Sequence, residues 1–409
     1  MAGVVRRLAP SEEMFAGGEV YIGYCIRVVG AVDLPALTVA FEATVRAHPI
    51  LGVRIEAADS GHVFVETDTP PRVMVAEGDP DRLFVGATFD QRESVAALCV
   101  ARAEETAGIT LMIHHSVADT RHALAVVETL WSCYDAVVRG SVPEPRPHPY
   151  PAPVEELLAA RGVRKLDLPH PPDPPSPPDP SVAPPVTADE YPVSVTTRCR
   201  LTREETTALV DLGHREGVTV HELVSAALLH TESELRELAL SELLYLYSVD
   251  LRARVTPEIG PTEGTNVLGM ASYLPAAEVG AGPLGLARGI GETFRAALSA
   301  GVVQQSPLHI GDPGAAPPPV PGIVVATNWG TLPTPAVPSG LRVRDFHSAI
   351  IAKPDRSGRR PRQPGAGTTI ISTFAGRLSV EIHHPPEFTD LQRHRVDLLT
   401  ATLRGLPRP

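Results

Sequence analysis

The positions of apolar residues along the first 140 residues predict strands that alternate with helices. Residues 20–29, VYIGYCIRVV, are rich in β-branched and aromatic side chains, which is typical of a strand. After Asp33, which can cap a helix, apolar residues recur at helical spacing until Pro49, where the ring forbids continuation. Residues 52–66 then predict a hairpin that turns at the sequence DSG, residues 59–61.

A similar alternation returns in the second half of the chain. Two helices there are predicted from capping boxes, because Thr202 and Thr219 are each followed three residues later by a glutamate. The remaining predicted elements are a strand at 193–201, a strand at 242–252, a helix at 285–298, a hairpin at 367–384 that turns at Gly376, and a helix from 389 to 404.

Proline separates the two halves. Residues 169–185, PHPPDPPSPPDPSVAPP, lack too many amide donors for a helix or a sheet interior, so we expect a semi-rigid spacer. Only residues 154–163, VEELLAARGV, offer a short helix in this region. We therefore expect two α/β lobes, with boundaries at 1–145 for the N-terminal lobe, 146–190 for the crossover and 191–409 for the C-terminal lobe.

Composition agrees with two lobes and excludes some functions. A chain of 409 residues exceeds the size at which single cores stop growing. The formal net charge of -12 opposes non-specific binding to nucleic acid. No apolar stretch approaches the roughly 20 residues of a membrane span, and the N-terminus has no apolar signal region. The four cysteines form no C-x-x-C pair, which argues against a thiolate zinc site or a redox motif. We expect a cytoplasmic protein with reduced cysteines and no stable membrane insertion.

The candidate chemistry lies in residues 108–119, GITLMIHHSVAD, where an apolar strand ends on two histidines. Side chains alternate along a strand, so His114 and His115 point in opposite directions and only one can face a cleft between lobes. If that residue is His115, then Asp119 stands at the head of the next helix, where the helix dipole favours a carboxylate. Asp119 would then fix the turn that aims the imidazole.

Other chemistries fit this segment less well. Zinc needs ligands that converge from one face, whereas adjacent strand residues diverge. No G-x-S-x-G elbow surrounds any serine, and no cysteine lies in a recognisable catalytic motif. A lone imidazole acting as general base fits, and the alternative is a pair of hydrogen-bonded core histidines at a strand end.

The whole arrangement resembles a known family. H-H-x-x-x-D is the signature of the condensation-domain superfamily of acyltransferases, and the chain is most similar to polyketide-associated acyltransferases of the phthiocerol/phthiodiolone dimycocerosyl transferase type. The segments that carry the resemblance follow the family order: SEEMFA (11–16), IHHSVAD (113–119), RGVRK (161–165), VDLR (249–252), PTEGTNVLGMASYL (261–274), GVVQQSPLHIG (301–311) and EIHH (381–384).

The resemblance implies two lobes like chloramphenicol acetyltransferase, with a tunnel at their interface. It also implies that His115 is catalytic, that His114 is its structural neighbour, and that Asp119 holds the motif through an arginine, for which Arg252 is the candidate. The donor would be a phosphopantetheine thioester of coenzyme A or of an acyl carrier protein, and the acceptor a hydroxyl of a polyketide, lipid or related natural product. No permanently bound cofactor and no metal are implied.

One position departs from the family. The motif usually continues with glycine, whereas residue 120 is a threonine, which is bulkier and restricts the backbone. Thr120 is therefore a candidate for shaping the acceptor site. Asn266 and Ser272 are candidate donors to the oxyanion, although a turn and a strand end are the preferred explanation for these two residues.

The basic segment at 353–365 is a candidate docking site for the donor, or else a solvated surface loop. Its arginines are Arg356, Arg359, Arg360 and Arg362. Two alternatives to ester formation stay open: an amide-forming condensation enzyme, and a catalytically degenerate module that only binds a carrier protein, which Thr120 would favour.

Overall fold

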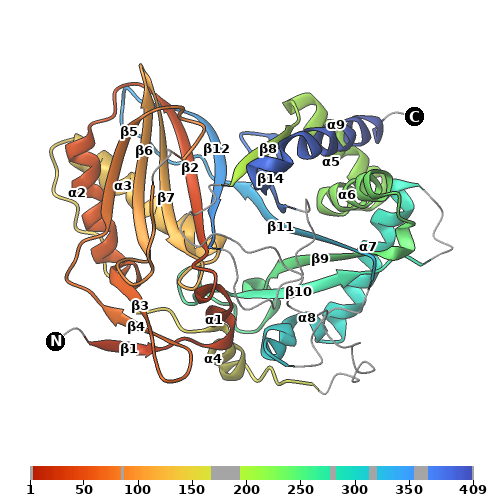
Figure 1. The fold of residues 1–409 in the computed structure, drawn as a ribbon, viewed down its shortest axis with the longest axis horizontal. Helices are drawn as coiled ribbons and strands as arrows, with labels where there is room; N and C mark the ends of the chain where they lie inside the picture. Colours follow the sequence, from red (N-terminus) through yellow and green to blue (C-terminus); the bar gives the residue numbers. More distant parts are fainter. Residues whose placement is uncertain are drawn as a thin grey trace.

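The computed structural model describes residues 3–83, 87–166, 194–276, 282–312, 320–353 and 367–407. Two lobes lie side by side, and each combines β-sheet with helices (Figure 1). The predicted proline spacer at 169–185 lies outside the described residues, while the short helix before it forms as α4 (Val154–Ala160). The predicted class of two α/β lobes is therefore confirmed.

A five-stranded sheet forms the centre of the N-terminal lobe. In spatial order its strands are β12 (Arg342–Ile351), β2 (Tyr21–Val29), β7 (Thr106–His114), β6 (Ala96–Ala103) and β5 (Arg72–Glu77). A smaller sheet contains β1 (Val4–Arg7), β4 (His62–Glu66) and β3 (Val53–Ala57). The helices are α1 (Pro10–Ala16), α2 (Leu34–Ala47) and α3 (Thr120–Val138). The first core, which includes Leu37, Phe41 and Trp131, is formed by α2 and α3 together with the strands.

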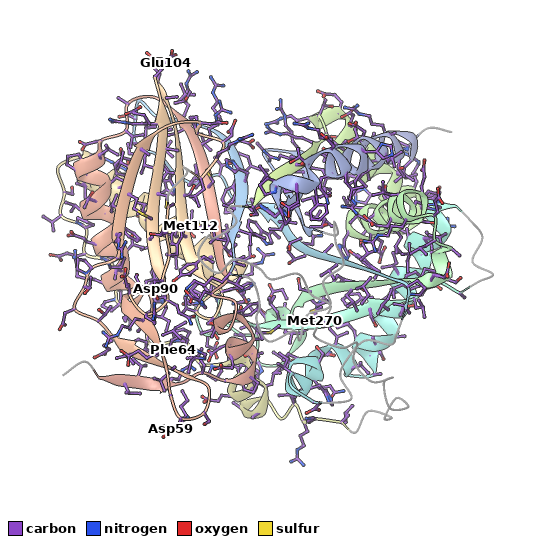
Figure 2. The ribbon with its side chains drawn as sticks, in the orientation of Figure 1. Asp59, Phe64, Asp90, Glu104, Met112 and Met270 are labelled. Carbon is purple, nitrogen blue, oxygen red and sulfur yellow. The ribbon has the colours of Figure 1, made fainter. Side chains whose placement is uncertain are left out.

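Local predictions in this lobe are confirmed. The Asp33 carboxylate accepts a hydrogen bond from the Ala36 amide at 2.9 Å, so it caps α2 as expected. The β3–β4 hairpin turns at the predicted residues, with Gly61 at a φ of 72° that favours glycine. Figure 2 shows Asp59 of this turn at one end of the lobe and Glu104 of the β6–β7 turn at the other.

A six-stranded mixed sheet forms the centre of the C-terminal lobe. In spatial order its strands are β10 (Leu268–Tyr273), β9 (Leu243–Asp250), β11 (Gly322–Leu332), β13 (Thr368–Phe374), β14 (Arg377–His384) and β8 (Val195–Arg200). Its helices are α5 (Arg203–Glu216), α6 (Val220–Arg236), α7 (Pro283–Ser299), α8 (Val302–Gln305) and α9 (Thr389–Gly405). Both predicted capping boxes are present. None of the helices in the described parts of the chain combines the length and apolar character that a bilayer crossing demands.

One strand crosses between the halves of the sequence. Strand β12 falls within the range expected for the C-terminal lobe, 191–409, yet it pairs antiparallel with β2 along its whole length, from Arg342 opposite Val29 to Ile351 opposite Tyr21. The sequence boundaries did not anticipate this pairing, because backbone hydrogen bonds between distant strands leave no signature in the local pattern of side chains.

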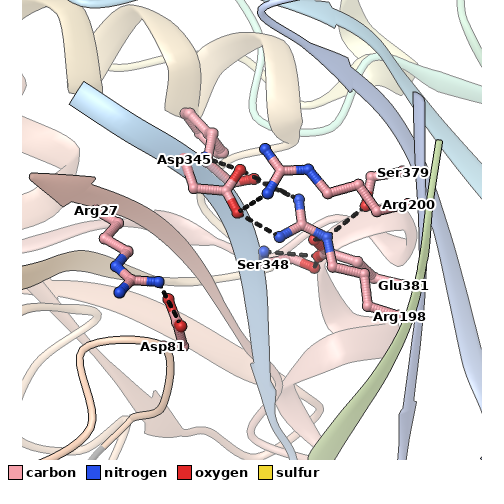
Figure 3. A network of polar contacts seen from close by, with 9 residues as sticks. Arg27, Asp81, Arg198, Arg200, Asp345, Ser348, Ser379 and Glu381 are labelled. Carbon is pink, nitrogen blue, oxygen red and sulfur yellow. Dashed lines mark hydrogen bonds and ion pairs between the residues drawn. The ribbon is translucent and has the colours of Figure 1, made fainter. Parts of the chain in front are cut away.

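Charged side chains join β12 to the sheet of the C-terminal lobe (Figure 3). Two arginines of β8 converge on Asp345 of β12, with Arg198 Nη1 at 2.6 Å and Arg200 Nη1 at 3.0 Å from its Oδ2. Beside them, the Ser348 amide of β12 donates to Glu381 of β14 at 2.8 Å. We call this group the inter-lobe clasp: Arg198, Arg200, Asp345, Ser348 and Glu381. It holds β12 of the first sheet against β8 and β14 of the second.

We predict that Asp345→Asn destabilises the protein at neutral pH by about 3 kcal/mol, because two arginines would lose their buried counter-charge. Burial would raise the pKa of Asp345, but Arg198 and Arg200 outweigh it and hold that pKa below its ordinary value. A depressed carboxylate pKa contributes stability above the pKa of the unfolded chain, and that contribution disappears as the pH falls through the folded value. The difference between variant and wild type should therefore shrink below about pH 4.

Urea unfolding between pH 3 and pH 7 measures this difference. Asp390→Asn is the matched control, since its carboxylate also pairs with an arginine, Arg393, but is 97% exposed. The control should change the free energy of unfolding by less than about 0.5 kcal/mol. Equal effects of the two substitutions would contradict the assigned role of the clasp.

Candidate active site

The two histidines at the end of β7 occupy different environments. His114 is fully buried, with its ring edge-on to Tyr21 at a centroid distance of 4.9 Å. Its Nδ1 accepts a hydrogen bond from the Ser116 amide at 3.1 Å, so the neutral ring carries its proton on Nε2. Burial lowers the pKa of His114 to about 3. His114 is therefore a neutral packed residue at physiological pH.

His115 directly follows β7 and keeps part of its surface exposed. Its backbone is fixed on both sides: its amide donates to the Val20 carbonyl at 2.7 Å, and its carbonyl accepts from Asn266 Nδ2 at 2.7 Å. One face of its ring stacks on Phe15. Burial lowers the pKa of His115, against opposing contributions from its own carbonyl and from Asp119. The neutral ring, which is the form that can accept a proton, therefore predominates at pH 7.

The Asp119 carboxylate is fully buried and fully matched by donors. It caps α3 by accepting from the His122 amide at 3.0 Å, and it accepts from the Val267 amide at 2.8 Å. Arg252 binds it in a bidentate manner, with Nη1 at 2.8 Å from Oδ2 and Nη2 at 3.0 Å from Oδ1. The predicted ion pair between Asp119 and Arg252 is therefore present in the structure.

Arg252 reaches Asp119 from the C-terminal lobe. It begins a single 3-10 turn (Arg252–Arg254) directly after β9, and its Nη1 and Nη2 also contact Asp250 at 3.2 Å and the Pro261 carbonyl at 3.1 Å. Burial would lower the pKa of Arg252, but Asp119 and Asp250 outweigh it and raise that pKa. Arg252 thus keeps its charge although it is only 7% exposed.

The other sequence candidates lie in three different settings. Thr120 is the first residue of α3, and its side chain lies beside Tyr24 of β2. Asn266 donates one of the two hydrogens of its amide nitrogen to the His115 carbonyl. Ser272 is exposed on β10, opposite Leu246 of β9. The docking candidates Arg356, Arg359, Arg360 and Arg362 lie outside the described residues.

The cysteines are poorly placed for catalysis. All four are buried and unlinked, and burial raises the pKa of Cys99 to about 12. In the described ranges, no group of three or more histidine, cysteine, aspartate or glutamate side chains is arranged to hold a metal ion.

Sequence reasoning missed several residues that surround the motif. Phe15 stacks on His115, the Val267 amide completes the shell of Asp119, and the Thr265 carbonyl accepts from the Asp119 amide at 2.8 Å. The family-like segments at 11–16 and 261–274 were the available signal, since both contribute these residues. Their contacts could not be inferred, because they depend on how distant segments pack.

We predict that Asp119→Ala destabilises the protein by about 3 to 5 kcal/mol, because it leaves the Arg252 charge buried without its partner. The catalytic activity of the remaining folded protein should also fall, since the turn that carries His115 loses its anchor. Urea unfolding and initial rates measure the two effects. Asp250→Asn is the control, because it also contacts Arg252 but is partly exposed, and it should be milder. A folded, fully active Asp119→Ala protein would exclude the role given to this carboxylate.

Comparison with known proteins identifies the family. The family model of the C-terminus of phthiocerol/phthiodiolone dimycocerosyl transferase matches residues 190–383. The phthiocerol/phthiodiolone dimycocerosyl transferase of Mycobacterium ulcerans is 34% identical over 390 residues, which cover 93% of this chain and 92% of that protein.

Solved structures agree with this match. Polyketide synthase associated protein 5 from Mycobacterium tuberculosis superposes with a TM-score of 0.81 at 30% identity, covering 100% of this chain and 99% of the other. The first condensation domain of the calcium-dependent antibiotic synthetase, with a TM-score of 0.66 at 14% identity over 100% and 98% of the two chains, shares the fold. The chain therefore belongs to the phthiocerol/phthiodiolone dimycocerosyl transferase family, and it is an O-acyltransferase.

Proposed function

We propose that His115 is the general base of a direct acyl transfer from a thioester to an alcohol. The imidazole takes the hydroxyl proton while the alcohol oxygen attacks the thioester carbonyl. The new C–O bond forms, the C–S bond breaks, and the proton passes to the departing thiolate. The observation that carries this proposal is the contrast between the two histidines: His114 is sealed in the core, whereas His115 is neutral, held by its backbone and partly exposed.

The environment of the His115 ring supports Nε2 as the atom that moves the proton. Nδ1 is buried and has no hydrogen-bond partner among the described residues, so a substrate hydroxyl cannot reach it. With the proton on Nδ1, the lone pair of Nε2 is free to act as base. Asp119 and Arg252 act through the backbone, because the Asp119 carboxylate is already occupied by His122, Val267 and Arg252.

The tetrahedral intermediate needs donors for its oxyanion. One hydrogen of Asn266 Nδ2 already donates to the His115 carbonyl, and the second is left for another acceptor. We propose that Asn266 fixes the backbone of the motif, and it stays a candidate donor to the oxyanion. Ser272 stays a candidate for substrate contact, because its position on β10 is exposed.

We propose a donor thioester carried by phosphopantetheine, on coenzyme A or on an acyl carrier protein of a polyketide synthase, and an acceptor that is a lipid or polyketide alcohol bound at the lobe interface. The names of the relatives support this choice: the M. ulcerans protein is a phthiocerol/phthiodiolone dimycocerosyl transferase, and the M. tuberculosis protein is polyketide synthase associated. The basic segment with Arg356, Arg359, Arg360 and Arg362 is the proposed docking site for the donor.

We predict that His115→Gln lowers the rate of ester formation by about 100-fold to 10,000-fold, because general acid–base catalysis typically contributes that factor. Mass spectrometry of reactions with a panel of acyl thioesters and hydroxylated acceptors measures the product. The half-buried position of His115 makes a folded variant the expected result, which circular dichroism checks.

His221→Gln serves as the control for loss of an imidazole, since His221 lies on α6 outside the motif. It should leave the rate within a few-fold of wild type. A fully active His115→Gln protein would exclude the proposed base. Amide products would favour the condensation reading, and no product with any pair would favour the carrier-binding module that Thr120 suggests.

We predict that Thr120→Gly widens the range of accepted alcohols while it lowers stability by about 1 kcal/mol. Glycine removes the side chain that lies between the motif and Tyr24, and it costs backbone entropy at a helix start. Relative kcat/KM values for small and bulky alcohols measure the effect. Thr120→Ser keeps the hydroxyl and should retain the wild-type preference. An unchanged preference in Thr120→Gly would show that this position does not shape the acceptor site.

A further inference from the structure

Phe15 covers one face of the His115 ring. The two ring centroids are 3.9 Å apart and the rings are inclined by only 13°, which is close parallel stacking. Phe15 belongs to α1 and is itself partly buried, at the edge of the first core. The contact therefore joins the partly exposed histidine to the first helix of the chain, α1.

Helix α1 is held tightly enough to fix this contact. Glu12 is fully buried, and Arg6 binds its carboxylate with Nη1 at 2.6 Å and Nη2 at 2.7 Å. The same carboxylate accepts from Thr265 Oγ1 at 2.7 Å, and the Glu12 carbonyl accepts from Ser116 Oγ at 2.7 Å. One turn of helix is thereby tied both to the residue that follows His115 and to the segment of the C-terminal lobe that carries Asn266.

We propose that Phe15 is a positioning residue for His115, anchored by Glu12, and this inference rests on the proposed function. Its ring fixes the plane of the imidazole and keeps water from one face. When His115 has taken the hydroxyl proton, the negative face of the phenyl ring also attracts the imidazolium. Phe15 thus favours the protonated form of the base more than an aliphatic neighbour of similar bulk would.

A purely structural role gives a different expectation. If Phe15 only completed the edge of the core, its loss would lower the amount of active protein and scale the rate equally at every pH. If Phe15 positions the base, replacing it by an aliphatic residue of similar bulk keeps the ring desolvated but removes the attraction between the π face and the imidazolium. The pKa of His115, which burial already lowers, should then move further below its ordinary value.

The test compares Phe15→Leu with Phe15→Tyr by pH profiles of kcat and KM for ester formation. Leucine fills space without a π face, so we expect kcat to fall about 3-fold to 30-fold, with KM nearly unchanged and the acidic limb of the profile shifted to lower pH. Tyrosine keeps the stacked ring and should restore both the rate and the wild-type limb. Met14→Ala on the exposed side of α1 is the matched control and should change neither.

The midpoint of the pH profile does not depend on enzyme concentration, so partial unfolding of Phe15→Leu leaves the comparison valid. An unshifted limb, or a tyrosine variant as impaired as the leucine variant, overturns the positioning role. The role of Phe15 can fail without the role of His115 failing. If the His115→Gln protein keeps full activity, the proposed function is wrong. If His115→Gln is inactive and Phe15→Leu has the wild-type rate and pH profile, only the role of Phe15 is wrong.

Discussion

The buried Asp119 carboxylate is the constraint on which the rest of the site depends. It accepts from the amides of His122 and Val267 and from both terminal nitrogens of Arg252. A buried charge is costly unless donors surround it, so this set tolerates little displacement of any member. Since the donors come from α3 and from two segments of the C-terminal lobe, one side chain fixes where the lobes meet and where His115, four residues earlier, must lie.

The inter-lobe clasp provides a second, independent connection. Asp119 joins the lobes beside the motif, whereas Asp345 joins them through β12, a strand that leaves the second half of the chain to complete the first sheet. Both connections use arginine, whose planar group can bind a carboxylate through two nitrogens and keeps its charge when buried. Two separate ionic contacts resist rotation of one lobe against the other better than one would, which suits a site proposed at their interface.

The chemistry proposed for His115 requires an imidazole that is neutral at rest and yet able to hold a proton briefly. Burial supplies the first property by lowering the pKa, and the nearby His115 carbonyl and the Asp119 charge oppose it. His114 lacks this balance, because its pKa falls to about 3 in the core. His114 ends β7 inside the core, whereas His115 directly follows the strand and is partly exposed, so the two rings have different surroundings.

The sequence by itself determined the local features of this protein. The strand before the histidines, the helix that Asp119 caps and the capping boxes at Thr202 and Thr219 all follow from periods of two or 3.6 residues and from short-range hydrogen bonds. The motif, together with the family-like segments, also indicated Arg252 as the partner of Asp119.

Only the tertiary structure decided the contacts between distant segments. The pairing of β12 with β2, the stacking of Phe15 on His115 and the use of Asn266 on the His115 carbonyl join parts of the chain that are roughly 100 to more than 300 residues apart. Such contacts arise from packing and from the matching of buried polar groups across the whole fold. No local pattern of apolar and polar residues encodes which of many distant partners will meet.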